Sequence, residues 1–268
     1  MKEIYFDHSA TTAVKREVLN EMIPYFNLEY GNPSSLHKMG LNAQIHMDNA
    51  RKSIAKAIGC NSTDSIIFTS GATESSNISK RKKKVVTTTI EHASVKECFN
   101  ELERLGFEVV RISPNKDGEI TYQDIVNAVD DNTFLVSCML VNNETGYILP
   151  IEKSYSIIKK LYPDVITHCD CVQGFLKVPI NVRTLKADLI SISGHKVHAP
   201  KGVGALYVAK GTRISKSNLG GKQEKGFRSG TEALPNIAGF GSAVEVFYPT
   251  IKERFEYVSS LKEYLINS

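Results

Sequence analysis

The sequence predicts an α/β fold in which a mostly parallel sheet is covered by helices on both faces. Short runs rich in β-branched and apolar residues recur along the chain, and amphipathic helical patterns separate several of them. Parallel strands need such crossover connections, and the connecting helices then cover the sheet. With 268 residues, 41% of them hydrophobic, the chain is long enough to bury one large core.

Seven runs bounded by turn residues are predicted to be buried strands. They span residues 65–70, 84–92, 107–113, 133–142, 165–171, 188–195 and 205–210. Three helices, with apolar residues three or four positions apart, are expected between these strands at residues 94–105, 121–129 and 151–161.

The two ends of the chain are predicted to be helical. Helices at residues 14–26 and 42–58 precede the first strand, so a helical segment 1–60 is expected to pack beside the sheet in one large domain, residues 1–236. Residues 237–268 are expected to form one long helix with an apolar stripe from Phe240 to Leu261. This helix would lead to a small carboxyl-terminal domain that is truncated.

Composition and charge exclude several classes of protein. No run approaches the roughly 18 apolar residues of a membrane span, and the polar start "MKEIYFDHSATT" is unlike a signal peptide, so a cytoplasmic protein is expected. The net charge of +4 is small and its one basic run enters a strand, which argues against direct nucleic-acid binding. An odd number of cysteines in apolar patterns favours reduced thiols, and their spacing is not that of a metal site: Cys60, Cys98, Cys138, Cys169 and Cys171.

Polar residues follow five of the predicted strands, at the edge of the sheet where α/β proteins bind ligands. Taken singly, most have an ordinary structural interpretation: the "SGATES" hydroxyls as a helix cap, His92 as a satisfied hydrogen-bonding residue, and "VNNETG" as a turn. Asp170 is different, because a carboxylate after an apolar run needs a partner if it is buried. Lys196 follows the sixth run in "SISGHK".

One cofactor explains this set of residues together. Pyridoxal phosphate (PLP) needs an amine for a Schiff base, a carboxylate at its ring nitrogen and donors for its phosphate. Composition and periodicity do not name this cofactor; a resemblance does, because the chain resembles the cysteine desulfurases of the class V aminotransferase group, PLP enzymes of fold type I. The resemblance covers nearly the whole chain and is carried, in the family's order, by "YFDHSATT", "YGNPSSLH", "TSGATES", "TTTIEHASV", "VNNETG", "HCDCVQ", "SISGHKVHAPKGVGALYV" and "GFRSGTE".

The resemblance implies a role for each matching residue. Lys196 would form the Schiff base, Asp170 would pair with the ring nitrogen, and His92 would stack on the ring and act in catalysis. Gln173 would bond the phenolic oxygen, and Asn143 would help to hold the substrate carboxylate. The residues implied for the phosphate are Ala72, Thr73, Ser193, His195 and, across a homodimer, Thr231.

The implied activity is conversion of L-cysteine to L-alanine, with the sulfur leaving as a persulfide for iron–sulfur cluster assembly or tRNA thiolation, passed to an acceptor or scaffold protein. In this family a loop cysteine and a carboxylate-binding arginine belong to the carboxyl-terminal domain, and both would lie beyond Ser268. None of the five cysteines is expected to replace that nucleophile. The alternative is a catalytically incomplete PLP-binding or scaffold protein. The segment between Asn77 and Lys84 is also shorter than the family's usual helix.

Overall fold

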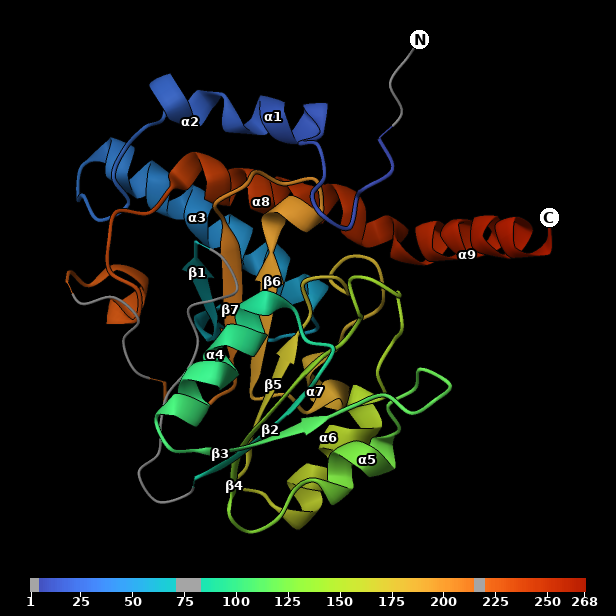
Figure 1. Ribbon diagram of the computed structural model, residues 1–268. Coiled ribbons are helices and arrows are strands. Elements are labelled where there is room, and N and C mark those ends of the chain that lie inside the picture. Colours follow the sequence, from blue (N-terminus) through green and yellow to red (C-terminus); the bar gives the residue numbers. More distant parts are fainter. Residues whose placement is uncertain (1–4, 71–82, 215–219) are drawn as a thin grey trace.

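The computed structural model describes residues 5–70, 83–214 and 220–268. Seven strands form one sheet in the order β1-β7-β6-β5-β4-β2-β3, with only β7 running opposite to the others (Figure 1). All seven predicted strands are present, and the mostly parallel sheet is confirmed. Their bounds are β1 (Ile66–Thr69), β2 (Lys84–Thr88), β3 (Glu108–Ile112), β4 (Thr133–Met139), β5 (Ile166–Asp170), β6 (Leu189–Ser193) and β7 (Gly204–Val208).

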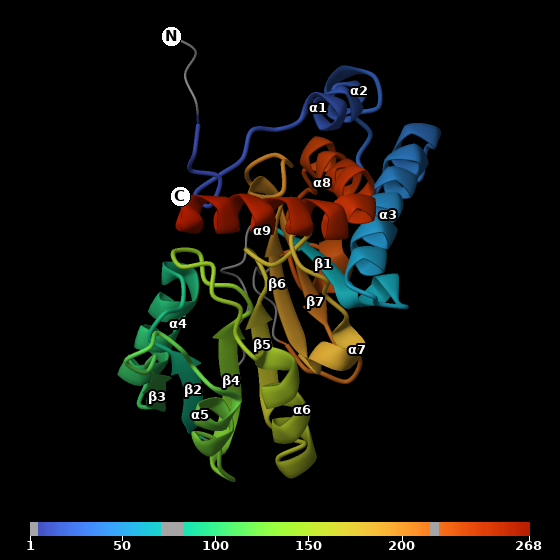
Figure 2. The same ribbon diagram turned by 90° about the vertical axis from the view of Figure 1, so that its right-hand side faces the viewer.

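Helices cover both faces of the sheet, as Figure 2 shows most clearly. The α-helices are α1 (Arg16–Met22), α2 (Pro24–Asn27), α3 (Lys38–Ala57), α4 (Ala93–Arg104), α5 (Tyr122–Asn127), α6 (Ile151–Leu161), α7 (Val182–Leu185), α8 (Leu234–Phe247) and α9 (Ile251–Asn267). Short 3-10 helices are η1 (Thr63–Ser65), η3 (Gly194–Lys196), η4 (Gln223–Gly226) and η5 (Tyr248–Thr250). No helix in the described ranges is long and apolar enough to span a membrane.

Alternation along the strands divides the core between the two faces. Val85 packs in a small cluster with α4, whereas its neighbour Val86 belongs to the main core. Successive side chains of a strand point to opposite faces, so α4 lies on one face and the main core on the other. Helices α3, α5, α6, α7 and α8 contribute to that main core.

Two helices that the pattern predicts as continuous are divided at prolines. The first is split at Ile23 into α1 and α2, and the last is split into α8 and α9 by η5, which contains Pro249. Proline lacks the N–H that a regular helix needs, and its ring crowds the preceding turn, so the helical backbone is interrupted at these residues. The hydrophobic periodicity continues past both prolines and therefore does not show the interruptions. The single helix predicted for residues 237–268 is therefore wrong.

The same division corrects the predicted apolar stripe. Phe240 and Val244 of α8 are fully buried, and α8 packs against α1 and α3, so half of the stripe is covered within this chain. Phe255, Val258 and Leu261 of α9 remain exposed. Whether a domain boundary lies at residues 236–237 stays a prediction.

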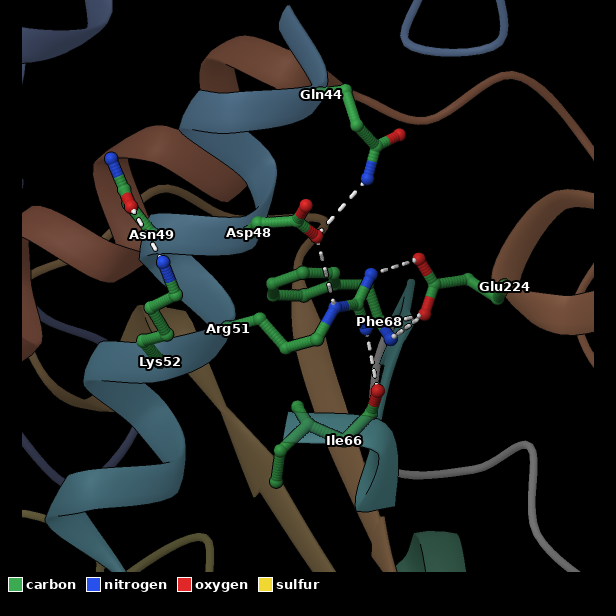
Figure 3. A network of polar contacts seen from close by, with 8 residues as sticks. All are labelled: Gln44, Asp48, Asn49, Arg51, Lys52, Ile66, Phe68 and Glu224. Atoms are coloured by element: carbon green, nitrogen blue, oxygen red, sulfur yellow. Dashed lines mark hydrogen bonds and ion pairs between the residues drawn. The ribbon is translucent and has the colours of Figure 1, made fainter. Parts of the chain in front are cut away.

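A buried ion pair fixes the segment around η4 to the edge strand β1 (Figure 3). The Arg51 guanidinium donates to both carboxylate oxygens of Glu224, at 2.8 and 2.9 Å, and stacks over Phe68. Glu224 also accepts from the Phe68 backbone N–H at 2.8 Å, and Arg51 donates to the Ile66 carbonyl. Because two charges that leave water need such partners, the pair holds the chain just before Thr231 in one place.

Candidate active site

A cavity of about 540 Å³ lies at the carboxyl ends of the central strands β4, β5 and β6. Seven of the residues proposed from the sequence line it: His92, Asn143, Asp170, Gln173, Ser193, His195 and Lys196. Parallel strands bring their carboxyl ends to one edge of the sheet, and the order of strands changes beside β4, which is where such folds bind ligands. The structure therefore brings together residues that lie up to 104 positions apart, from His92 to Lys196.

Lys196 reaches the cavity from η3, directly after β6. Its Nζ donates to the carbonyl oxygens of Ser9 at 2.5 Å and Ala10 at 2.7 Å, so the loop near the amino terminus lies against the lysine. Burial lowers the pKa of Lys196 below its ordinary value, while Asp7 and Asp170 oppose that shift. A lowered pKa favours the neutral amine, the form that attacks a carbonyl.

Asp170 is the last residue of β5 and is 4% exposed. Within the described residues its carboxylate accepts one hydrogen bond, from the Val172 N–H at 2.9 Å to Oδ1. Burial raises the pKa of the Asp170 carboxyl, and the nearby His92 and Lys196 lower it only in part. A cationic group in the cavity would supply the ionic partner that this buried carboxylate lacks among the described residues.

His92 caps helix α4 and also lines the cavity. Its Nδ1 accepts from the Ser94 N–H at 3.2 Å and lies 2.9 Å from Ser94 Oγ. The interpretation of His92 as a satisfied hydrogen-bonding residue is therefore correct for Nδ1. These contacts also fix the orientation of the imidazole ring. The same cap holds the imidazole at the cavity, where a flat ring can stack on a ligand.

Gln173 and Asn143 enter the cavity from loops after β5 and β4. The Gln173 amide donates from Nε2 to the Ser9 carbonyl at 2.9 Å and accepts from Lys177 Nζ at 2.7 Å. Asn143 donates to the Glu144 carboxylate at 2.6 Å. The neighbouring Asn142 makes the turn, because its Oδ1 accepts from the backbone of residues 144 and 145.

The residues proposed for a phosphate are divided between three situations. Ser193 and His195 line the cavity, and burial, ahead of the charges of Lys196 and Lys201, lowers the pKa of His195. Ala72 and Thr73, like most of the shortened segment before Lys84, lie outside the described residues. Thr231 is exposed and is not among the described residues that line the cavity.

Sequence reasoning assigned no role to several other residues at the cavity. Ala10 and Thr11 line it, and they belong to "YFDHSATT", whose match to the family was the available signal. Lys201 also lines it, from the glycine-rich turn after Lys196. Glu91 lies next to Met139, which lines the cavity, and its carboxyl group accepts from the Thr88 hydroxyl and from the Met139 N–H. Burial raises the pKa of the Glu91 carboxyl to about 8. No sequence pattern distinguishes that buried carboxyl from an ordinary turn residue.

The observed arrangement fits PLP. The cavity holds an amine of lowered pKa, a buried carboxylate short of a cationic partner, a fixed imidazole ring and hydroxyls at Thr11 and Ser193. Its volume is within the range of sites for small ligands. Fold and site together define a PLP-dependent enzyme of fold type I.

The chain belongs to the class V aminotransferase family, whose model, Aminotransferase class-V, matches residues 4–267. It is 40% identical over 274 residues to cysteine desulfurase IscS of Dictyoglomus turgidum, covering 99% of this chain and 69% of that protein. It is also 40% identical over 277 residues to cysteine desulfurase IscS of Rickettsia prowazekii, covering 99% and 67%. The chain thus spans about two thirds of the length of these relatives.

Solved structures give the same relationship. A NifS-like protein superposes with a TM-score of 0.95 at 40% identity, over 99% of this chain and 75% of that chain. A structure described as SspA in complex with cysteine superposes with a TM-score of 0.85 at 38% identity, over 91% and 73%. The expected family and fold are confirmed, and the chain is a member of a family of PLP-dependent enzymes.

Proposed function

We propose that this chain provides the cofactor and substrate-binding part of a cysteine desulfurase, which converts L-cysteine to L-alanine and passes sulfur on as a persulfide. The observation that carries the proposal is the convergence of Lys196, Asp170 and Gln173 on one cavity. The similarity to proteins named cysteine desulfurase, and to one solved in complex with cysteine, supports the choice of substrate. Iron–sulfur cluster assembly or tRNA thiolation is the proposed destination of the sulfur.

The residues of the cavity would divide the work between them. Lys196 would hold the cofactor and, once released by the substrate amine, move protons at the α and β carbons of cysteine, which suits an amine of lowered pKa. Asp170 would keep a proton on the ring nitrogen, and the His92 ring would fix the ring plane. PLP, when bound, supplies an electron sink for the bonds at the α carbon. Asn143 would orient the substrate carboxylate.

Sulfur transfer needs one further group, a thiolate that attacks the substrate sulfur and carries it away as a persulfide. None of the five cysteines lines the cavity. Cys138, Cys169 and Cys171 are fully buried, and burial raises the pKa of the Cys98 thiol above its ordinary value. We infer that the thiolate comes from outside these 268 residues.

This inference predicts the turnover of the chain by itself. Given PLP, the 268-residue chain should change its visible spectrum when L-cysteine is added, yet release little alanine or sulfide in the presence of a reductant. Loss of a covalent nucleophile commonly costs several orders of magnitude in rate. The measurement compares alanine and sulfide release with those of a full-length cysteine desulfurase. Sustained release at a comparable rate would contradict it, and mass spectrometry for a persulfide on Cys60 or Cys98 would then identify the nucleophile.

The absence of a cysteine at the cavity also favours a second candidate, a PLP-binding or scaffold protein that delivers no sulfur. The two candidates differ in one result. Adding a thiol-bearing acceptor in trans should start alanine formation and leave a persulfide on the acceptor, from which an added reductant releases sulfide, if the cavity can complete the proton transfers. It should change nothing if the chain only binds the cofactor.

We further propose a homodimer with a shared site. Thr231 is exposed and follows the segment that the Arg51–Glu224 ion pair anchors, and the exposed Phe255, Val258 and Leu261 of α9 offer apolar area to a partner. Light scattering at micromolar concentration should show a dimer or a larger species. A monomer would count against the shared site.

A further inference from the structure

A second lysine lies one hydrogen bond behind the cavity. Lys177 lies four positions after Gln173 in the loop that follows β5, and its Nζ donates to Gln173 Oε1 at 2.7 Å. Burial lowers the pKa of Lys177 to about 8, with the charges of Lys196 and Arg254 acting in the same direction. Among the described residues no carboxylate pairs with Lys177. A partly buried ammonium with an amide as its partner needs an explanation.

The contact determines which way the Gln173 amide faces. A lysine ammonium can only donate, so the atom beside it must be the amide oxygen. The other end, Nε2, donates to the Ser9 carbonyl at 2.9 Å, which can only accept. Both neighbours therefore require the same orientation of the amide. Its NH2 group, Nε2, faces the loop that carries Ser9, and its oxygen faces Lys177.

The backbone around Lys177 is held as firmly as its side chain. Leu176 is buried and adopts a left-handed conformation, with φ of 55°, which is costly for a residue with a side chain. Its carbonyl accepts from Arg254 of α9 at 2.8 Å, and that guanidinium also donates to the Phe247 carbonyl at 2.8 Å. These bonds compensate for the strain and direct Lys177 back to Gln173.

We propose that Lys177 is a positioning residue that acts through Gln173 on the bound cofactor. It orients the amide so that Nε2 faces the phenolic oxygen of the ring, and its charge strengthens Nε2–H as a donor, because a cation on the carbonyl end polarises the amide. The proposal rests on the assignment of Gln173 to the phenolic oxygen. It requires nothing of the sulfur-transfer step.

The test is the spectrum of the cofactor-loaded protein, without turnover. A donor to the phenolic oxygen stabilises its anionic form and so makes the neighbouring lysine–cofactor nitrogen less basic. Lys177→Met should therefore raise the pH midpoint of the visible absorption change by about half a unit to one unit. It should also weaken PLP binding about 5- to 10-fold, measured by equilibrium titration. Lys177→Arg, which keeps a cationic donor, should restore much of both.

A double-variant comparison separates this role from a simple effect of charge. In a Gln173→Ala background, Lys177→Met should lose most of its effect on the midpoint, since the amide that transmits it is gone. A shift of the same size in both backgrounds would overturn the proposal. If Gln173→Ala alone leaves the midpoint unchanged, the assignment of Gln173 is what fails.

The matched control is Lys160→Met, which removes an exposed lysine of α6. It should leave the midpoint and the PLP affinity unchanged. Should Lys177→Met fail to fold, Lys177→Gln provides a polar replacement without the charge, and circular dichroism of each variant identifies that case. An unshifted midpoint in a folded Lys177→Met or Lys177→Gln protein would contradict the proposal.

Discussion

The two faces of the central strands differ in chemistry, although they belong to the same sheet. On the face of the main core, β4, β5 and β6 present Cys138, Cys169 and Ile190, all fully buried. On the opposite face they present Ser137, His168 and Ser191, which are also buried but polar. Ser137 Oγ lies 2.7 Å from His168 Nδ1, and Ser191 Oγ lies 2.9 Å from His168 Nε2.

This difference shows how the sheet separates stability from chemistry. The apolar face gains free energy by removing area from water. The polar face is tolerable only because each group has a partner, and it continues along β5 from His168 to Asp170 at the cavity. Substitutions on the polar face should therefore alter the cofactor and the pH response, and those on the apolar face should alter stability.

The largest effect is expected at Lys196. Lys196→Ala should abolish the visible band of lysine-bound cofactor altogether, because it removes the amine proposed to form the Schiff base. The urea midpoint of the cofactor-free protein should hardly move, since the bonds of this side chain within the described residues are two, to the Ser9 and Ala10 carbonyls. An unchanged absorption spectrum would show that the assignment of Lys196 is wrong.

The converse is expected at Phe240. This ring is fully buried in the main core and packs edge-on against Phe175, with centroids 6.0 Å apart. Phe240→Ala should lower the free energy of unfolding by about 3–5 kcal/mol, from lost burial and the cavity that remains. Below the unfolding transition, the pH midpoint of the bound cofactor should match that of the unsubstituted chain. A shifted midpoint would mean that the faces are coupled.

A pH-dependent effect is expected at Glu91. Its folded pKa of about 8 lies above the ordinary 4.5, so the unfolded chain loses this proton first as the pH rises. The contribution of Glu91 to the free energy of unfolding is fully present below about pH 4.5 and is lost as the pH approaches 8. Glu91→Gln cannot ionise at this position. Between pH 5.5 and 8.5, its free energy of unfolding should therefore rise by about 2–4 kcal/mol relative to that of the unsubstituted chain. The measurement is urea unfolding of both proteins at the two pH values. The same difference in free energy of unfolding at pH 5.5 and at pH 8.5 would contradict the prediction.

A smaller effect of the opposite sign is expected at His168. Burial lowers its folded pKa to about 4 from 6.5, so the unfolded chain binds this proton first as the pH falls. The contribution is fully present above about pH 6.5 and is lost toward pH 4, by up to about 3 kcal/mol. His168→Gln should flatten that acid-side slope in urea unfolding. An unchanged acid-side slope in the His168→Gln protein would contradict this prediction.

Much of the fold could be predicted because it depends on local patterns. Seven apolar runs became seven strands, and the helices at residues 94–105 and 151–161 formed within one residue of the predicted bounds. Pro24 and Pro249 were visible in the sequence, but the hydrophobic period continued past them and concealed the breaks. Periodicity reports which face is buried, and proline reports whether the backbone can continue.

The sequence by itself determined the strands and, through the resemblance, the family, the cofactor and the residues from His92 to Lys196. These follow from short patterns and from residue types at strand ends. Only the tertiary structure decided that Lys177 orients Gln173, that Glu91 is buried beside Met139, and that Arg51 pairs with Glu224. Such roles depend on burial and on which partners lie within hydrogen-bond distance. Neither exists until distant segments pack, so no local pattern of residues encodes them.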